Sequence, residues 1–294
     1  MTLLFCKIFY TVAEQGSFAK AAEVLRLTPS AVSHSVSGME KELGFQIFNR
    51  NKSGVTLTSY GEVIYPYVLD MLNGEERLNQ VVDNLNGLEK GTVRLGAFNS
   101  VCIHWLPPLL QEFRRRFPRI VVEVYEGTYD DVIYWLNAGI VEIGFLSTSC
   151  NTEFPIKPLY DDRLVCIVPK GFPTKRPGKI SVKEMQKQSF VVQREACDAD
   201  IKKFINDKEL DIHRSCHVID DQATAAMVAS GFGISIMPEL TSRNLSDRVD
   251  VLEIDETSMR TIGVAVPNKK GMTPAAEKLF DLILEYGQMV KSDL

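Results

Sequence analysis

The spacing of apolar residues predicts three consecutive helices at the start of the chain. The first covers residues 3–14, and two more lie within the stretch Ser17–Leu43. Thr28 is placed to cap the third helix, and Pro29 suits its first turn, where a missing N–H costs nothing. The apolar residues of this third helix recur every three or four positions and so share one face; they are Val32, Val36, Met39 and Leu43.

The opposite face of the third helix carries small polar side chains, namely Ser30, Ser33, His34 and Ser37. A half-buried helix that presents short hydrogen-bonding groups near its N-terminal end suits reading of the DNA major groove. The same pattern also fits any helical hairpin with a serine-rich surface, and this stretch alone leaves both interpretations open.

Residues 45–57 predict a β-hairpin after the helices. Its turn is Lys52-Ser53-Gly54, and residues 55–57 alternate like a short strand. Arg50 and Lys52 lie near the tip of this wing, where cations can bind DNA phosphates without reading the base sequence. Two basic residues in an exposed turn can equally well be solvated.

A single long helix is predicted from Thr58, which can cap it, to about Leu88. A helix of this length with one narrow apolar stripe is typical of pairing with a partner helix. The residues from Asn86 to Gly91 then predict a hinge. The stripe consists of Ile64, Val68, Met71, Leu78, Val82 and Leu85.

Beyond the hinge, strands alternate with helices, which predicts an α/β domain with a parallel sheet. A first βαβαβ unit is expected at 92–98, 106–117, 120–125, 128–137 and 142–147. A second unit begins with a strand at 163–169. Its later elements are expected at 190–193, 199–208, 215–219, 222–230, 233–237 and 261–266, with a final helix at 274–289.

Length, cysteine spacing and charge narrow the class of protein. The 294 residues suggest about two domains, and no apolar run reaches the roughly 18 residues of a membrane span. The six cysteines show no C-x-x-C spacing, which favours reduced thiols in a cytoplasm over disulfides or a zinc site. The net charge is −5, yet residues 1–60 carry six Lys and Arg against four Glu, a balance compatible with DNA binding.

Residues 12–50, followed by VTLTSYGE, closely resemble the DNA-binding domain of LysR-type transcriptional regulators. The chain departs from the family pattern at His34 and Ser35, where many members carry Arg and Gln, so its recognition helix is less basic than usual. The motifs that carry the resemblance are Gly16-Ser17-Phe18, Ala21-Ala22, Thr28-Pro29-Ser30, Leu43-Gly44, Ile47-Phe48-Asn49-Arg50 and Leu57-Thr58.

The resemblance implies a winged helix-turn-helix domain at 1–58, a linker and dimerisation helix with its hinge at 59–90, and an effector-binding domain at 91–294. The effector domain is expected to be a two-lobed α/β structure, like periplasmic binding proteins. Its lobe one would comprise 91–162 and 268–294, and lobe two 163–267. The chain would cross to lobe two near Asp161-Asp162 and return near Pro267.

The resemblance also implies the partners. These are a double-stranded DNA operator, a small-molecule effector, and a second copy of the chain bound through the linker helix, giving a dimer or a tetramer. RNA polymerase would be a further partner of an activator. DNA contacts are expected from Thr28, Pro29, Ser30, Ser33, His34, Ser37, Arg50, Lys52, Thr56 and Thr58.

Ligands of open α/β sheets bind beyond the carboxyl ends of the strands, beside the helices that follow. We predict a small organic acid or other small anion there, with Ser100 and Thr128 at its polar end and Arg194 as counter-charge. Both hydroxyl residues could instead be helix caps, and Arg194 could pair with Glu195. The predicted lining is Asn99, Ser100, Val101, Thr128, Tyr129, Ser147, Thr148, Gln193, Arg194, Asp220 and Gln222.

Enzyme chemistry is not indicated, and no cofactor or metal is expected. The sequence has no G-x-S-x-G, H-E-x-x-H, P-loop or G-x-G-x-x-G motif, and its four histidines are scattered.

Two alternative functions stay open. Cys197 near Arg194 could make a thiol-redox-responsive regulator of the same fold. A solute-binding receptor would fit the α/β half, but it would leave residues 1–88 without a use.

Overall fold

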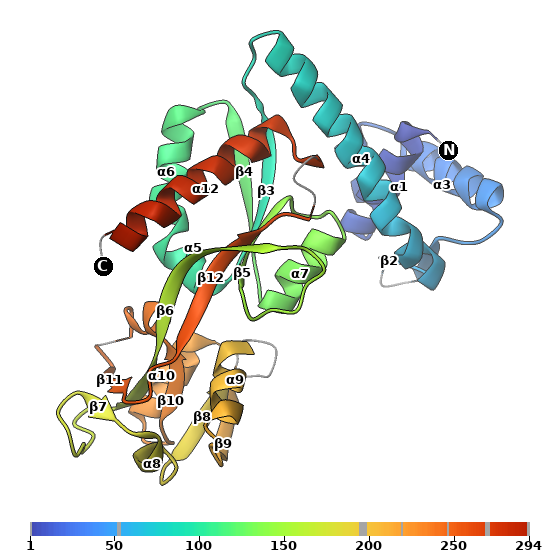
Figure 1. Cartoon of the computed structure of the whole chain (residues 1–294). Coiled ribbons are helices and arrows are strands. Elements are labelled where there is room, and N and C mark those ends of the chain that lie inside the picture. Colours follow the sequence, from blue (N-terminus) through green and yellow to red (C-terminus); the bar gives the residue numbers. More distant parts are fainter. Residues whose placement is uncertain are drawn as a thin grey trace. The chain divides into compact units, whose positions relative to one another are not determined.

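The structure, a computed structural model, describes residues 2–51, 54–193, 199–218, 220–245, 247–267 and 271–292 (Figure 1). The chain divides into two compact units. The first comprises Met1–Lys90 and Asn137–Ile140, and the second comprises Gly91–Leu136 and Val141–Leu294. Within the described ranges, no helix is both long and apolar enough to cross a membrane.

The first unit contains α1 (Leu3–Gln15), α2 (Phe18–Leu25), α3 (Pro29–Leu43), β1 (Phe48–Asn51), β2 (Gly54–Leu57) and α4 (Ser59–Leu85). Strands β1 and β2 pair antiparallel, which confirms the predicted hairpin. The predicted caps form at Thr28 and Thr58, whose hydroxyls accept hydrogen bonds from backbone N–H groups in the first turns of α3 and α4. These caps bind backbone N–H groups that have no intrahelical partner in the first turn of a helix.

The predicted apolar face of α3 is confirmed. Val32, Val36 and Met39 are buried, and Leu43 packs at the edge of the same core. Phe9 of α1 is buried in the same core. Burial of one face of α3 leaves its opposite face toward solvent.

Helix α4 carries two apolar stripes, where the sequence predicted one. Ile64 and Val68 pack on the core of the first unit, so their assignment to a partner-facing stripe was wrong. Gly61 allows this close packing, because a Cβ there would lie 2.3 Å from the carbonyl oxygen of Ile47. The second stripe is exposed and keeps helical spacing along the helix; it consists of Tyr60, Val63, Tyr67, Met71, Leu78, Val82 and Leu85.

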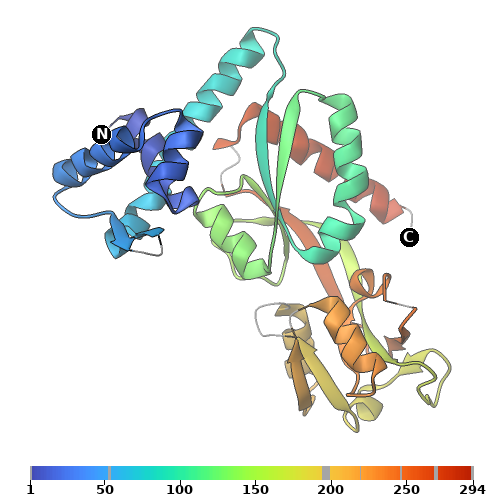
Figure 2. The same cartoon turned by 180° about the vertical axis from the view of Figure 1, so that it is seen from behind.

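Lobe one of the second unit contains the predicted βαβαβ unit. Its strands β3 (Gly91–Ala97), β4 (Ile120–Glu126) and β5 (Ile143–Ser147) are parallel, in the order β4-β3-β5. The connections hold α5 (Asn99–His104), which was not predicted, α6 (Leu106–Arg116) and α7 (Tyr129–Asn137). Because the strand order reverses at β3, right-handed connections place α6 and α7 on opposite faces of the sheet (Figure 2).

Two long strands join the lobes. β6 (Ile156–Pro169) pairs antiparallel with β12 (Met259–Ala265) as far as Arg163, and then continues into lobe two. β12 pairs with β5 of lobe one from Ile262 onward. The second half of β12 therefore belongs to the sheet of lobe one, while its first residue, Met259, pairs with Arg163. The return of the chain to lobe one near Pro267 stays a prediction.

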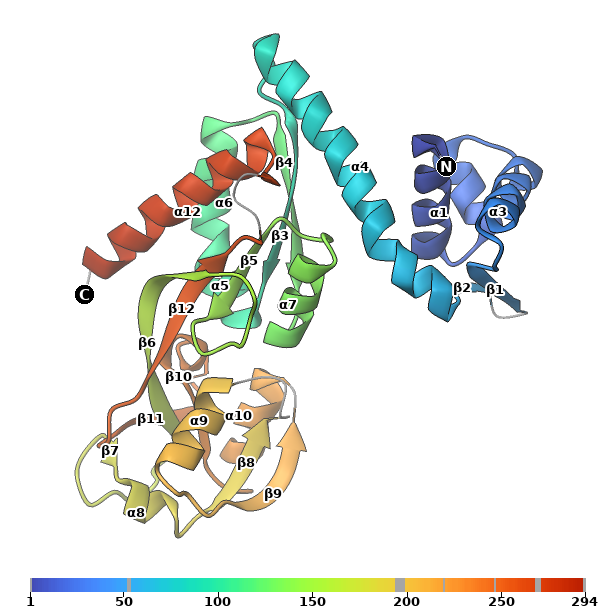
Figure 3. The same ribbon diagram turned by 45° about the vertical axis from the view of Figure 1, so that its right-hand side comes forward.

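Lobe two holds β10 (Ser235–Pro238) and β11 (Val249–Ile254) against β6, with β7 (Lys179–Ile180) at the edge of that sheet. A separate parallel pair, β8 (Ser189–Gln193) and β9 (His213–Val218), lies beside α9 (Ala199–Asp207) and α10 (Asp221–Ala229) (Figure 3). The short α8 (Val182–Met185) and α11 (Glu239–Ser242), together with β7 and β11, were not predicted.

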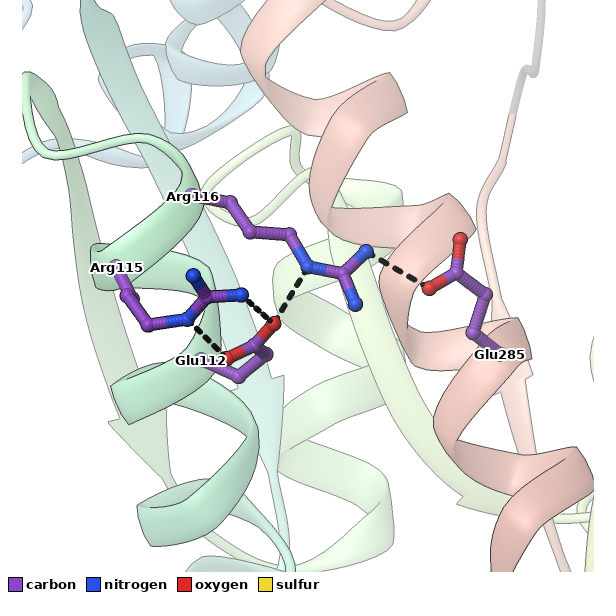
Figure 4. A network of polar contacts seen from close by, with 4 residues as sticks. All are labelled: Glu112, Arg115, Arg116 and Glu285. Atoms are coloured by element: carbon purple, nitrogen blue, oxygen red, sulfur yellow. Dashed lines mark hydrogen bonds and ion pairs between the residues drawn. The ribbon is translucent and has the colours of Figure 1, made fainter.

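The last helix, α12 (Pro274–Ser292), packs against α6 in lobe one, as the resemblance implied. An ion-pair network joins the two helices (Figure 4). Glu112 accepts hydrogen bonds from Arg115 and Arg116, and Arg116 Nη1 lies 2.9 Å from Glu285 Oε2 on α12. The bond from Arg115, followed by that from Arg116, lowers the pKa of Glu112 to about 2.

Candidate DNA-reading helix and effector cavity

The outward face of α3 presents the predicted DNA-reading side chains. Ser30, His34 and Ser37 are exposed at helical spacing, on the side opposite Val32 and Val36. Ser33 is half-buried, so it lies at the border of this face. The outward face therefore offers hydroxyl and imidazole groups, which donate and accept hydrogen bonds at base edges.

Glu40 connects α3 to the wing. Its Oε1 accepts hydrogen bonds from the backbone N–H groups of Ile47 at 3.0 Å and Phe48 at 3.4 Å. Its Oε2 lies 3.5 Å from Arg50 Nη2, and the same nitrogen donates to Ser37 Oγ at 3.5 Å. The predicted phosphate contact Arg50 is thus placed beside the predicted base contact Ser37.

Some of the other predicted DNA-contacting residues are exposed, and others are engaged in local structure or lie outside the described residues. Thr28 and Pro29 are exposed at the start of α3, and Thr56 is exposed on β2. Thr58 has its hydroxyl committed to local structure, because it donates to Gln46 O at 2.8 Å while capping α4. Lys52 lies outside the described residues.

A cavity of about 310 Å³ opens between the two lobes of the second unit. It brings together five predicted effector residues, which are Asn99, Ser100, Thr128 and Tyr129 from lobe one and Asp220 from lobe two. Its lining is Phe98, Asn99, Ser100, Glu126, Gly127, Thr128, Tyr129, Asp131, Asp220, Asp221, Pro238, Thr241 and Arg260.

The remaining predicted effector residues lie elsewhere. Val101 is buried in the core and Gln222 is exposed on α10. Ser147 is buried and donates to Asp200 Oδ1 at 3.0 Å, while Thr148 lines a different cavity of about 290 Å³. Val101, Ser147, Thr148 and Gln222 are therefore absent from the lining of the larger cavity. Gln193 ends β8, its side chain is not described, and Arg194 lies outside the described residues.

Arg260 is the central residue that the sequence did not reveal. Its buried guanidinium donates to Ser100 Oγ at 3.1 Å and to Tyr129 OH at 3.3 Å, and it pairs with Asp162. Pairing of β6 with β12 sets Arg260 opposite Asp162. The two residues are far apart in sequence, and only the register of the two long strands brings them together.

Several polar groups at the cavity are already engaged by carboxylates of the same lobe. The backbone N–H and the hydroxyl of Thr128 both donate to Asp131 Oδ2, at 2.8 and 2.7 Å. Asn99 Nδ2 donates to Glu126 Oε1 at 3.0 Å. At the start of α7, a carboxylate of the chain itself thus occupies the position predicted for a ligand's anionic group.

Two of the described thiols, those of Cys102 and Cys166, lack the environment of a reactive cysteine. Burial, and then the charge of Glu126, raises the pKa of Cys102 to about 12, and burial raises the pKa of Cys166 as well. Cys197, on which the redox alternative rests, lies outside the described residues. No group of three or more His, Cys, Asp or Glu side chains in the described part of the chain could hold a metal ion.

Comparison with known families decides the class of protein. Residues 5–62 match the family described as bacterial regulatory helix-turn-helix protein, lysR family. Residues 86–288 match the LysR substrate binding domain. The chain belongs to the LysR family of transcriptional regulators.

Relatives and solved structures of LysR-type regulators match almost the whole chain. The uncharacterized regulator YvbU of Bacillus subtilis is 27% identical over 288 residues, 97% of this chain and 98% of YvbU. The structure of a full-length OxyR variant from Pseudomonas aeruginosa has a TM-score of 0.77 and 21% identity, covering 98% of this chain and 95% of that one. Full-length CbnR complexed with its target DNA has a TM-score of 0.71 and 19% identity, covering 97% and 100%. These structures share the LysR-type fold with this chain.

Proposed function

We propose that this LysR-type regulator reads its operator with the outward face of α3, and that a small molecule in the inter-lobe cavity alters operator binding. The observation that carries the proposal is that residues of both lobes line one cavity around Arg260. A molecule that contacts both lobes binds one lobe arrangement better than another, and it shifts the equilibrium by that difference in affinity.

The proposed partners follow from the same arrangement. The exposed stripe of α4 is the surface for self-association into a dimer, and a tetramer would combine two dimers. An activator of this kind would also contact RNA polymerase. The proposed functional domains are 1–58, 59–90 and 91–294, with lobe one at 91–162 and 268–294 and lobe two at 163–267.

A gel-shift experiment on the DNA just upstream of the gene tests the DNA-reading half of the proposal. We expect sequence-selective binding that weakens between about 50 and 200 mM salt, because phosphate contacts release counterions. His34→Ala should reduce the preference for this DNA over a scrambled duplex by about tenfold, the loss expected from one base contact. Arg50→Ala should weaken binding to both duplexes alike, because it removes a phosphate contact.

Arg119→Ala is the matched control, since it removes an exposed cation from the second unit. It should leave both affinities unchanged. Equal loss of both affinities in the His34→Ala protein would show that His34 contacts the backbone and does not read bases.

A further inference from the structure

The charge of the inter-lobe cavity is opposite to the charge that an anionic ligand needs. Arg260 is the one cation among the lining residues that the structure describes, and its charge is balanced by the buried Asp162. Four carboxylates line the same cavity, Glu126 and Asp131 from lobe one and Asp220 and Asp221 from lobe two. The described lining is therefore strongly negative.

Several hydrogen-bond donors of the cavity are already engaged within the protein. Both donors of Thr128 bind Asp131, the Asn99 amide binds Glu126, and Arg260 binds Ser100 and Tyr129. A carboxylate or phosphate ligand that used these donors would have to displace these bonds, and it would also approach four like charges. Repulsion between like charges brought close together raises the free energy of binding.

We propose that the effector is a small organic cation, an amine with a short apolar body, and not the small anion expected from the sequence. This inference rests on the proposed function, because it names the ligand class of the same cavity. The ammonium group would lie among the carboxylates and donate N–H bonds to them. Phe98, Tyr129 and Pro238 supply apolar surface for the body of the ligand.

An organic cation suits the carboxylates better than a metal ion does. No group of three or more His, Cys, Asp or Glu side chains that could hold a metal was found among the described residues. The four lining carboxylates instead come from both lobes, and like charges repel one another across the cavity. A bound ammonium cancels this repulsion, so it favours the arrangement in which the lobes lie closer together.

Three four-carbon probes separate the ligand classes at constant ionic strength. They are 1,4-diaminobutane, 4-aminobutanoate and succinate, which differ in their charged ends and share a similar chain. In thermal unfolding of the full-length protein, about 10 mM diamine should raise the Tm by about 2–4 °C. The zwitterion should have a smaller effect, and succinate should have none.

Two sets of substitutions test the location of the effect. Glu126→Gln combined with Asp221→Asn should abolish the shift caused by the diamine, while the amide oxygen introduced at position 126 can still accept from Asn99. Glu123→Gln, on the exposed face of β4, removes the same kind of charge outside the cavity and should retain the shift. Circular dichroism of each variant confirms folding.

The inference is overturned if the diamine gives no shift, if succinate gives the larger one, or if the shift survives the double substitution. The proposed function fails separately, through absence of selective DNA binding in the gel shift. Stabilisation by succinate together with selective DNA binding would restore the anion and leave the regulator intact.

Discussion

The cation that lines the described cavity is Arg260, whereas the sequence predicted Arg194 as the cation of the effector cavity. The local rule that ligands gather beyond strand ends selected Ser100 and Thr128, which do line the cavity, because that rule depends only on the order of elements. It selected Arg194 as the cation because that residue follows a strand. The buried cation of the described cavity is Arg260, whose place depends on the register between β6 and β12. Register between strands so far apart in sequence leaves no local signal.

The thiols of Cys102 and Cys166 should be inert in the native protein. A pKa of about 12 leaves about one Cys102 thiol in ten thousand as thiolate at pH 8, and the thiolate is the reactive form. We expect no alkylation of either residue by iodoacetamide under native conditions, as measured by peptide mass spectrometry. The unfolded protein, in which both must react, is the control. Rapid native alkylation of Cys102 would contradict the burial that raises its pKa.

At the scale of elements, the spacing of apolar residues predicted those helices and strands whose formation depends on their own local sequence. The helices of the first unit, its hairpin and the parallel β3-β4-β5 sheet all follow from apolar spacing and turn residues. The elements that were missed are short or lie in lobe two, such as α5, α8 and β7. Elements of two to six residues contain too little of a repeat to show a period, and tertiary packing decides them.

The contact between α3 and the wing should depend on Glu40. Its carboxylate is the acceptor for two backbone N–H groups of the segment that leads into β1. Glu40→Ala leaves those donors without their partner, which should lower the free energy of unfolding of the first unit by about 1–3 kcal/mol. Thermal or urea unfolding measures the loss. Glu23→Ala removes an exposed glutamate from α2 and should change stability little, and equal losses in the two variants would refute the role of Glu40.

At the scale of the whole molecule, α4 exposes apolar side chains to water that packing within a single chain does not cover. One side of it completes the core of the first unit through Val68. The other side leaves Leu78 62% exposed and Leu85 83% exposed to water. Apolar surface of this extent along one helix marks a site for another protein surface. Its spacing of three and four residues is that of helix pairing, which favours a second copy of α4.

Leu78→Asp should therefore weaken self-association and, with it, operator binding. Burial of a leucine contributes about 1.5–3 kcal/mol, and a symmetric interface loses two of them and gains two buried carboxylates. Size-exclusion chromatography with light scattering should show a smaller species at micromolar concentration, and the gel shift should weaken because two half-sites are no longer bound together. Asn79→Asp adds the same charge at the neighbouring exposed position, so it separates loss of the apolar contact from charge alone. If both variants keep the size of the unmodified protein, the exposed stripe of α4 does not mediate self-association. In that case a different surface of the chain mediates it.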